Sequence, residues 1–569
     1  MHKKAIYISI IFFLISINHS TAFFSAGNSS NSGEYLIANI SININDYDTS
    51  YDYLKKIHSD TSYEYLKKVH SINPYKQEIL EKLIFIETMK GNLSLANKYA
   101  EKILQLECVT SLYQRCRNNI EFQAQLVKGI YNISKGNIGE ASNNFNNFYL
   151  KNVTQINFAR ILDAWSWANK KNFNKSIELI DSINSNDYQF ITIFHKALIY
   201  DLANEVELAE VYFDQSLVLN SEIYIINLYL SFLDRNNKIE KKKQIIEKYL
   251  SGYDQDFIKR LTKFKPQRII SSEIDGISVA LFNTYELLRD INDNQKFFII
   301  NLASAISDHF IENKFVLADT FISLSDYQTA IKIFKSIPAD NYLSEITALK
   351  IVNIYSMSGD NQKAENYLMN NDLLKNSFQG LITLGNLHRY ESQWDAAIDT
   401  YKKAIEKKKN DPGFNLWDAY YKIGISYERK KDWKKAEEYL LKALNYSSFQ
   451  PDVLNYLGYT YLDLNITPKF EDARKMLEEA LKQKPDDAYI LDSMAWYYFK
   501  VGKFNESLQL FEYAILIDPS DPTINDHFGD VLWKVGKFSQ ARYQWRKALD
   551  INEDKIVSKR IRKKLILGL

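Results

Sequence analysis

Two identical five-residue stretches decide the fold of this chain: KVGKF at residues 500–504 returns as KVGKF at residues 534–538. The copies are 534 − 500 = 34 residues apart, and residues around them keep the same distance, as Ala495 does with Gly529. One helical hairpin of this length cannot bury its apolar face alone, whereas stacked hairpins bury it against their neighbours. The period therefore predicts an array of helix pairs.

Each repeating unit carries the pattern of two amphipathic helices that approach closely. Small residues recur in the first helix at Gly385, Gly424, Gly458, Ala495 and Gly529, and in the second helix at Ala397, Ala436, Ala473, Ser507 and Ala541. Large residues that fill the space between the helices recur at Tyr401, Leu440, Leu477, Phe511 and Trp545. Gly502 and Gly536 predict the left-handed backbone that ends a helix. Asp521 and Pro522 predict an N-cap and a first-turn proline for the next helix.

The composition also fits an all-α protein. The chain has 569 residues, of which 46% are hydrophobic and 25% charged, as is usual for folded proteins. Its 9 Pro and 18 Gly are few for an all-β protein, which needs many turns. Lys plus Arg number 71 and Asp plus Glu number 70, so the charge balance does not favour nucleic acid as a partner.

The repeated residues resemble the tetratricopeptide repeat family most specifically at 378–553. Upstream the spacing is fainter but continues in Ala330 with Phe334, Ala209 with Phe213, Ala141 with Phe145, and Gly91 with Ala96. The resemblance implies an all-α solenoid with an irregular N-terminal half and a regular C-terminal half. We expect divergent repeats at 23–265, degenerate repeats at 266–377, regular repeats at 378–553 and a capping helix at 554–569. A lone proline at Pro266 marks the predicted junction.

The N-terminus has the three parts of a secretory signal peptide. Two lysines near the start precede an apolar run from Ala5 to Ile17, and small residues stand at Ser20 and Ala22. We predict that residues 1–22 are removed and that the mature protein is periplasmic, with no integral membrane span. The lack of a cysteine near the cut excludes lipid attachment at a processed N-terminal cysteine. The alternative is an uncleaved signal that anchors the chain in the inner membrane.

The chain has two cysteines, Cys108 and Cys116, 8 residues apart. On one straight helix they would lie about 12 Å apart, too far for a disulfide. A turn between them would bring the sulfurs together, and an oxidising compartment would then favour a bond. Both arrangements remain open from the sequence. Two thiols without a nearby histidine do not predict a metal site.

No catalytic or cofactor motif is recognisable, so the sequence predicts a protein that is not an enzyme and has no cofactor. Asp526 and His527 form the most suggestive polar pair, but they fall in the first helix of the last repeat, where polar groove residues are expected. The basic run Lys559–Lys564 could serve a membrane or nucleic acid. The apolar residues within and beside it favour instead a final helix that covers the last repeat. A hydrolase with an unrecognised site stays as an alternative of another class.

Tetratricopeptide arrays bind partners in a concave groove lined by the first helix of each pair, so the resemblance implies a protein or peptide partner. The groove positions here are Tyr421, Arg429, Tyr459, Asp492, Trp496, Phe499, Lys500, Asp526, Asp530, Trp533 and Lys534. Aromatic side chains beside mixed charges suit a protein surface or an extended peptide. We expect Trp496, Phe499 and Trp533 to be anchors. Arrays that hold a C-terminal carboxylate use a lysine where Asp492 and Asp526 stand, so that clamp is absent.

Several stretches resemble a narrower group, the long exported tetratricopeptide proteins of proteobacteria. They include Leu454–Tyr459, Tyr489–Tyr498, Ile524–Trp533, Gly33–Leu36 and Lys563–Leu569. Some members are outer-membrane lipoproteins that act as adaptors, presenting cell-wall hydrolases to a periplasmic carboxyl-terminal processing protease. The resemblance implies a non-enzymatic interaction scaffold, with such a protease or hydrolase as partner. The alternative is a subunit of an envelope or polysaccharide-export assembly.

Overall fold

The computed structural model describes residues 67, 70–71, 77–105, 114–147, 153–168, 172–263, 267–285, 287, 293–409, 414–552 and 554–569. The predicted signal peptide, Cys108, the side chain of Cys116 and residues 264–266 of the predicted junction lie outside this part. Cleavage, the disulfide and the junction therefore stay predictions.

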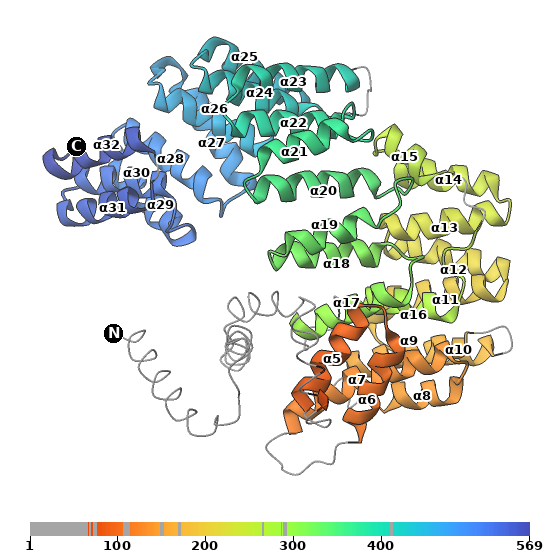
Figure 1. The fold of residues 1–569 in the computed structure, drawn as a ribbon. Coiled ribbons are helices and arrows are strands. Elements are labelled where there is room, and N and C mark those ends of the chain that lie inside the picture. The colour runs from red at the N-terminus through yellow and green to blue at the C-terminus, as the bar shows by residue number, and fades with distance from the viewer. Residues whose placement is uncertain are drawn as a thin grey trace, which may run out of the picture. The chain divides into compact units, whose positions relative to one another are not determined.

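The all-α prediction is confirmed, because the described residues form α-helices and two short 3₁₀ turns, with no strand among them. The chain divides into two compact units, the first ending at Leu343 and the second running from Ser344 to Leu569 (Figure 1). In each unit most helices pack in pairs that follow one another along the chain, with α15 and α32 as additional single helices.

The first unit contains α5 (Gln77–Met89), α6 (Leu93–Leu104), α7 (Gln114–Ser134), α8 (Ile138–Asn146), α9 (Val153–Ser166), α10 (Phe173–Asp181), α11 (Gln189–Ala203), α12 (Val206–Leu219), α13 (Ile223–Arg235), α14 (Ile239–Leu250), α15 (Gln255–Leu261), α16 (Glu273–Tyr285), α17 (Asp293–Ile306), α18 (Glu312–Ser323) and α19 (Tyr327–Lys335). A 3₁₀ turn, Asn186–Tyr188, leads into α11.

The second unit contains α20 (Ser344–Met357), α21 (Asn361–Asn370), α22 (Phe378–Tyr390), α23 (Trp394–Lys408), α24 (Trp417–Arg429), α25 (Trp433–Tyr446), α26 (Pro451–Asp463), α27 (Phe470–Gln483), α28 (Ala488–Lys500), α29 (Phe504–Ile517), α30 (Pro522–Lys534), α31 (Phe538–Ile551) and α32 (Lys555–Leu567). A 3₁₀ turn, Thr467–Lys469, leads into α27.

The repeated KVGKF stretch forms the turn between the two helices of a pair. Gly502 and Gly536 have φ angles of +80° and +81°, in the left-handed region that glycine adopts without strain. The amide of Lys503 donates to the carbonyl of Tyr498 at 2.9 Å, and that of Lys537 donates to Leu532 at 2.9 Å. The predicted helix ends are confirmed. Three further turns also place a glycine at positive φ, Gly91, Gly136 and Gly359. Other turns place a non-glycine residue there: Asn204, Asn237, Ser325, Ser392, Lys431 and Asn465.

The predicted contact between small and large residues holds the helices of each pair together. A Cβ atom added to Gly529 would lie 2.4 Å from the Trp545 ring, and one added to Gly385 would lie 2.4 Å from the Tyr401 ring. Only a residue without a side chain permits this approach. The N-cap prediction is also confirmed, since the Asp521 carboxylate accepts from the amides of Thr523 and Ile524 at 2.8 Å.

The first unit is closed by contacts between helices far apart in sequence. Helix α16 packs on α7, α9 and α11, and α17 packs on α5, as Figure 1 shows for α16 beside α9 and α11 and for α17 beside α5. A Cβ atom on Gly276 of α16 would lie 2.1 Å from the ring of Trp165 in α9. One continuous apolar core runs through this unit. The first helices α7, α9 and α11 are therefore covered by the chain itself.

The second unit is built by neighbour-to-neighbour stacking. First helices contact the first helix of the next pair, as α20 does with α22, α26 with α28, and α28 with α30. Its buried apolar residues form several separate clusters along the array. We call the surface formed by α20, α22, α24, α26, α28 and α30 the first-helix face.

Candidate functional site

The C-terminal end of the first-helix face is covered by helix α32. Lys564 donates to Asp526 at 2.7 Å and to Asp530 at 2.8 Å, and Arg560 donates to Asp526 at 2.9 Å. Ile561, on the same helix, is fully buried. Because two cations neutralise the two carboxylates, Asp526 and Asp530 are core residues that attach α32.

Asp530 has a second partner inside the last pair. The indole nitrogen of Trp545 donates to the Asp530 carboxylate at 2.9 Å. Burial and then the nearby Asp526 raise the pKa of Asp530, although Lys564 acts in the opposite direction. Trp533 lies under the C-terminal end of α32, where a Cβ atom on Gly568 would come within 2.1 Å of its ring. The Trp533 ring is therefore partly covered by the C-terminal end of the chain.

Helix α28, the first helix of the preceding pair, contributes two rings to an aromatic stack. The ring of Trp496 stacks on His527 with centroids 4.0 Å apart and on Phe499 at 4.7 Å. Nδ1 of His527 and the carboxylate of Asp492 are 2.9 Å apart. Burial alone would lower the pKa of His527, but Asp492, Asp526 and Asp530 outweigh it and raise the pKa above 6.5. Trp496 is only 8% exposed.

These contacts correct part of the predicted groove. Asp492, Trp496, Asp526 and Asp530 are buried side chains with partners in the chain, so they are not exposed groove residues. The reason is that α32 pairs with Asp526 and Asp530, while the His527 ring stacks on Trp496 and contacts Asp492. The pair Asp526 and His527 is equally inaccessible to a substrate.

The remaining predicted residues lie at the edge of this end or farther along the face. Lys500 donates to Asn465 at 2.9 Å, and Lys534 is exposed. Tyr459 is half-buried, with its ring 6.2 Å from that of His527. Tyr421 is half-buried against Tyr456, and burial raises its pKa to about 12. Arg429 is exposed at the C-terminus of α24.

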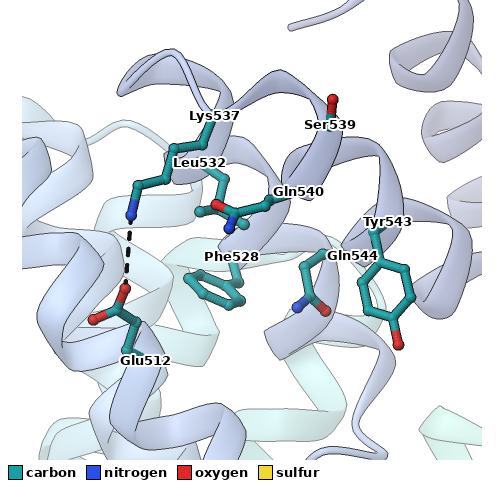
Figure 2. Close-up of a pocket in the computed structure, with 8 residues that line it drawn as sticks. All are labelled: Glu512, Phe528, Leu532, Lys537, Ser539, Gln540, Tyr543 and Gln544. Carbon is teal, nitrogen blue, oxygen red and sulfur yellow. Dashed lines mark ion pairs between the residues drawn. The ribbon is translucent and has the colours of Figure 1, made fainter.

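A hollow of about 420 Å³ lies near the end of the array, over the last two helix pairs. Figure 2 shows its lining residues, which are Glu512, Phe528, Leu532, Lys537, Ser539, Gln540, Tyr543 and Gln544. Lys537 and Glu512 face each other across it, with Nζ and the carboxylate oxygen 3.9 Å apart. Its two charges thus compensate each other, and it has no excess charge to select a ligand.

A second hollow, of about 500 Å³, opens on the first-helix face between α20 and α26. We call it the first-helix hollow; its lining residues are Asn353, Ser356, Thr383, Asn386, Leu387, Arg389, Tyr390, Trp394, Ile425, Arg429 and Tyr456. These residues come from four successive first helices and from the start of α23. The lining contains two arginines and no carboxylate. Of the predicted groove residues, Arg429 alone lines it.

Hydrogen bonds to neighbouring side chains fix the polar residues of this hollow. The hydroxyl of Tyr401 donates to the Asn386 amide oxygen at 2.8 Å, and Tyr401 also hydrogen-bonds Arg389. Tyr456 donates to Glu428 at 2.9 Å, and the same carboxylate lies 3.5 Å from Nε of Arg429. Fixed donors with aromatic neighbours can hold a polar, anionic group.

Most of these lining residues were missed by the sequence analysis, yet the repeat contains the signal. The predicted groove residues Asp530, Trp533 and Lys534 stand 1, 4 and 5 positions after Gly529. The same offsets from the equivalent Gly385 give Asn386, Arg389 and Tyr390. Applying the offsets to every repeat, including the earliest regular one, would have identified the hollow.

Within the described part of the chain, every helix is too short or too polar to cross a membrane. In that same part, His, Cys, Asp and Glu side chains do not gather in groups of three that could hold a metal ion.

Comparison with known proteins relates the second unit to a repeat family. Residues 382–452 match the family model described as tetratricopeptide repeat. A tetratricopeptide repeat-containing protein of Pseudomonas aeruginosa is 31% identical over 120 residues, which are 21% of this chain. The chain covers 18% of that relative, less than a fifth of its length.

Solved structures that match part of this chain include two tetratricopeptide proteins. One, from Parabacteroides merdae, is 15% identical and has a TM-score of 0.36, with 45% of this chain and 98% of that chain covered. Another, YrrB, described as having an unusual peptide-binding site, is 22% identical with a TM-score of 0.26, covering 35% of this chain and 98% of that one.

Proposed function

This chain contains tetratricopeptide repeats, and from that premise we propose that it is a non-enzymatic scaffold whose partner protein binds the first-helix face of the second unit. Such repeats are generally protein-interaction scaffolds. The observation that carries the proposal is the first-helix hollow, where aromatic and arginine side chains remain open between α20 and α26. Aromatic residues and arginine are the types most enriched among binding hot spots.

The covering of several other first helices supports this location. In the first unit, α16 covers the first helices α7, α9 and α11. At the end of the second unit, α32 covers α30. The section from α20 to α26 is where first-helix side chains line a hollow with an excess of positive charge.

The finer role is that of an exported periplasmic adaptor that presents substrates to an envelope protease. It is supported by the signal-like N-terminus and by the resemblance of several stretches to exported tetratricopeptide adaptors. The second candidate is a subunit of an envelope or polysaccharide-export assembly, which the same first-helix face could serve.

Site-specific photocrosslinking tests the location and identity of the partner. A photoreactive residue replaces Tyr390, which is 78% exposed, in the full chain in cells that produce it. Leu516 of the second helix α29 is equally exposed, at 78%, and gives the matched control. We expect a protein crosslink at Tyr390 and not at Leu516. Equal crosslinking at both positions would contradict binding on the first-helix face.

The identity of the crosslinked protein separates the finer roles. Recovery of a protease or a cell-wall hydrolase supports the adaptor, and recovery of export-assembly subunits supports the second candidate. For export, N-terminal sequencing of the stable protein should begin at Phe23. A stable protein that begins at Met1 would contradict cleavage and favour the membrane anchor.

A further inference from the structure

The first-helix hollow has the chemistry of an anion site. Arg389 and Arg429 contribute two guanidinium groups to a lining without carboxylates. Arg429 is partly compensated by Glu428, whose oxygen lies 3.5 Å from its Nε. Glu428 also accepts from Tyr456 and so is shared between two donors. The hollow therefore keeps an excess of positive charge.

Arg389 is the residue whose bonding is least complete. It is half-buried, and its Nε atom is buried without a hydrogen-bond partner. Among the residues that the structure describes, none forms an ion pair with it; its contact is the neutral hydroxyl of Tyr401. A half-buried cation without a counter-charge is unfavourable, and a carboxylate that binds it by two parallel N–H···O bonds would relieve this cost.

The surroundings of the two arginines indicate what the anion is attached to. Tyr390 stands 78% exposed beside Arg389, and Trp394 and Ile425 add apolar surface. Asn386 keeps its amide N–H groups as donors, because its oxygen is the atom that accepts from Tyr401. Apolar rings next to cationic donors suit a peptide with an acidic side chain beside an apolar one.

We propose that the first-helix hollow binds an acidic side chain, aspartate or glutamate, from an extended segment of the partner protein, with an adjacent apolar residue against Tyr390 and Trp394. This inference rests on the proposed function and names the chemistry of its partner. Arg389 and Arg429 hold the carboxylate, and Asn386 donates to it or to the neighbouring backbone. The hollow does not lie at the positions where other arrays hold a C-terminal carboxylate. In this chain those positions are Asp492 and Asp526, and both are buried.

The test uses the purified full chain and a library of random short peptides, acetylated at the N-terminus and amidated at the C-terminus. We expect binders enriched in Asp or Glu next to a Phe, Tyr, Leu or Trp. Resynthesis with the acid as its amide should weaken binding by about tenfold or more, as expected for a hydrogen bond to a charged group. Increasing salt concentration should weaken the binding of the acidic peptides and leave the binding of the corresponding amide peptides nearly unchanged.

Variants locate the peptide in the hollow. Arg429→Gln and Tyr390→Ala alter exposed side chains, so they should leave folding intact and each weaken acidic binders by about tenfold. Arg389→Gln should have the same effect, with circular dichroism and melting as checks on its contact with Tyr401. Arg474→Gln is the matched control, because Arg474 belongs to the second helix α27 and pairs with Glu471 and Glu478.

The outcomes separate this inference from the proposed function. If peptides crosslink to Tyr390 but are neutral or basic, or are indifferent to Arg389→Gln and Arg429→Gln, the acidic chemistry is wrong and the binding face stands. If binders arise only from a library with free C-termini, the acidic side chain is wrong and a terminal carboxylate is the ligand. If every binder crosslinks equally to Tyr390 and Leu516, both proposals fail.

Discussion

Both units are built mainly from helix pairs, but the surface formed by the first helices is covered differently in the two. In the first unit, α16 covers α7, α9 and α11 through close neutral contacts such as Gly276 against Trp165. In the second unit, α32 covers only the last pair and does so through the ion pairs of Lys564 and Arg560. The difference shows that stacked helix pairs can be covered by a later helix in one unit and left open over most of their length in another.

Each unit also contains a buried Trp–His pair, and the two histidines differ in the charges that surround them. In the first unit the indole nitrogen of Trp165 donates to Nδ1 of His195 at 2.9 Å, and burial lowers the pKa of His195 to about 3. In the second unit Trp496 stacks on His527, whose pKa is raised by carboxylates despite burial. We therefore expect the histidine of the first unit to stay neutral to a lower pH, and the histidine of the second unit to stay protonated to a higher pH, than a free imidazole.

The largest expected effect comes from removing the cation that closes the second unit. Lys564→Met leaves Asp526 paired with Arg560 only and removes the ion pair of Asp530, inside a buried site. We expect a loss of about 3–5 kcal/mol in the free energy of unfolding of the second unit, as for other broken buried pairs. Hydrogen exchange of α30 amides measures it.

The control for Lys564→Met is Lys442→Met, which breaks an exposed pair with Glu438 on the second helix α25. It should cost about 0.5 kcal/mol or less. Adding Asp530→Asn to Lys564→Met should recover part of the loss. If the two lysine variants open α30 equally, the ion pairs do not attach α32.

The substitution Gly276→Ala tests the uncharged contact between α16 and α9 in the first unit. The added methyl group would lie 2.1 Å from the Trp165 ring, so α16 must move away from α9. We expect a destabilisation of up to about 3 kcal/mol, as for overpacked cores. Denaturant unfolding of the full chain, followed by exchange of α9 amides, detects it. Gly139 is an exposed residue of α8 with open space around its Cα atom, so Gly139→Ala should instead stabilise the first unit slightly.

The pH dependence separates the two histidines. Because the pKa of His195 is about 3 when folded and 6.5 otherwise, its contribution to stability is present above pH 6.5 and is lost as the pH falls. Between pH 6.5 and 5 the loss is about 1.5 × 1.4, or roughly 2 kcal/mol. For His527 the folded pKa is above 6.5, so its contribution is present below pH 6.5 and is lost as the pH rises through the folded pKa.

Denaturant midpoints of the full chain between pH 5 and 9 measure these contributions. His195→Gln should flatten the acidic side of the stability profile relative to the unchanged chain. His527→Gln should flatten the alkaline side. A change on the same side in both variants would mean that the two histidines share one charge state.

The smallest expected effect concerns the two indole nitrogens. Trp165→Phe leaves Nδ1 of His195 without its donor, whereas Trp496→Phe removes a nitrogen that is buried and has no hydrogen-bond partner. Both variants lose similar ring volume, so the difference reflects the hydrogen bond lost at Trp165 and the unsatisfied donor removed at Trp496. We expect Trp165→Phe to cost roughly 1 kcal/mol more than Trp496→Phe. Equal costs, measured by exchange in α9 and α28, would contradict the contrast between the two pairs.

The sequence by itself determined the helix pairs, their turns and their internal packing. The 34-residue period, the glycines at 502 and 536 and the facing of Gly529 with Trp545 follow from local pattern, because a turn and a close helix contact depend on residues near each other in the chain. The repeat offsets also contain the positions of Asn386, Arg389 and Tyr390.

Only the tertiary structure decided which of these positions are open. Asp526 and Lys564 are 564 − 526 = 38 residues apart, and Trp165 and Gly276 are 276 − 165 = 111 apart, so no local pattern predicts their contact. An aspartate with a lysine against it and an aspartate in an empty groove look alike in sequence. Burial depends on which distant helix covers the face, and that choice turned Asp492, Trp496, Asp526 and Asp530 into core and left Arg389, Tyr390 and Arg429 at the surface.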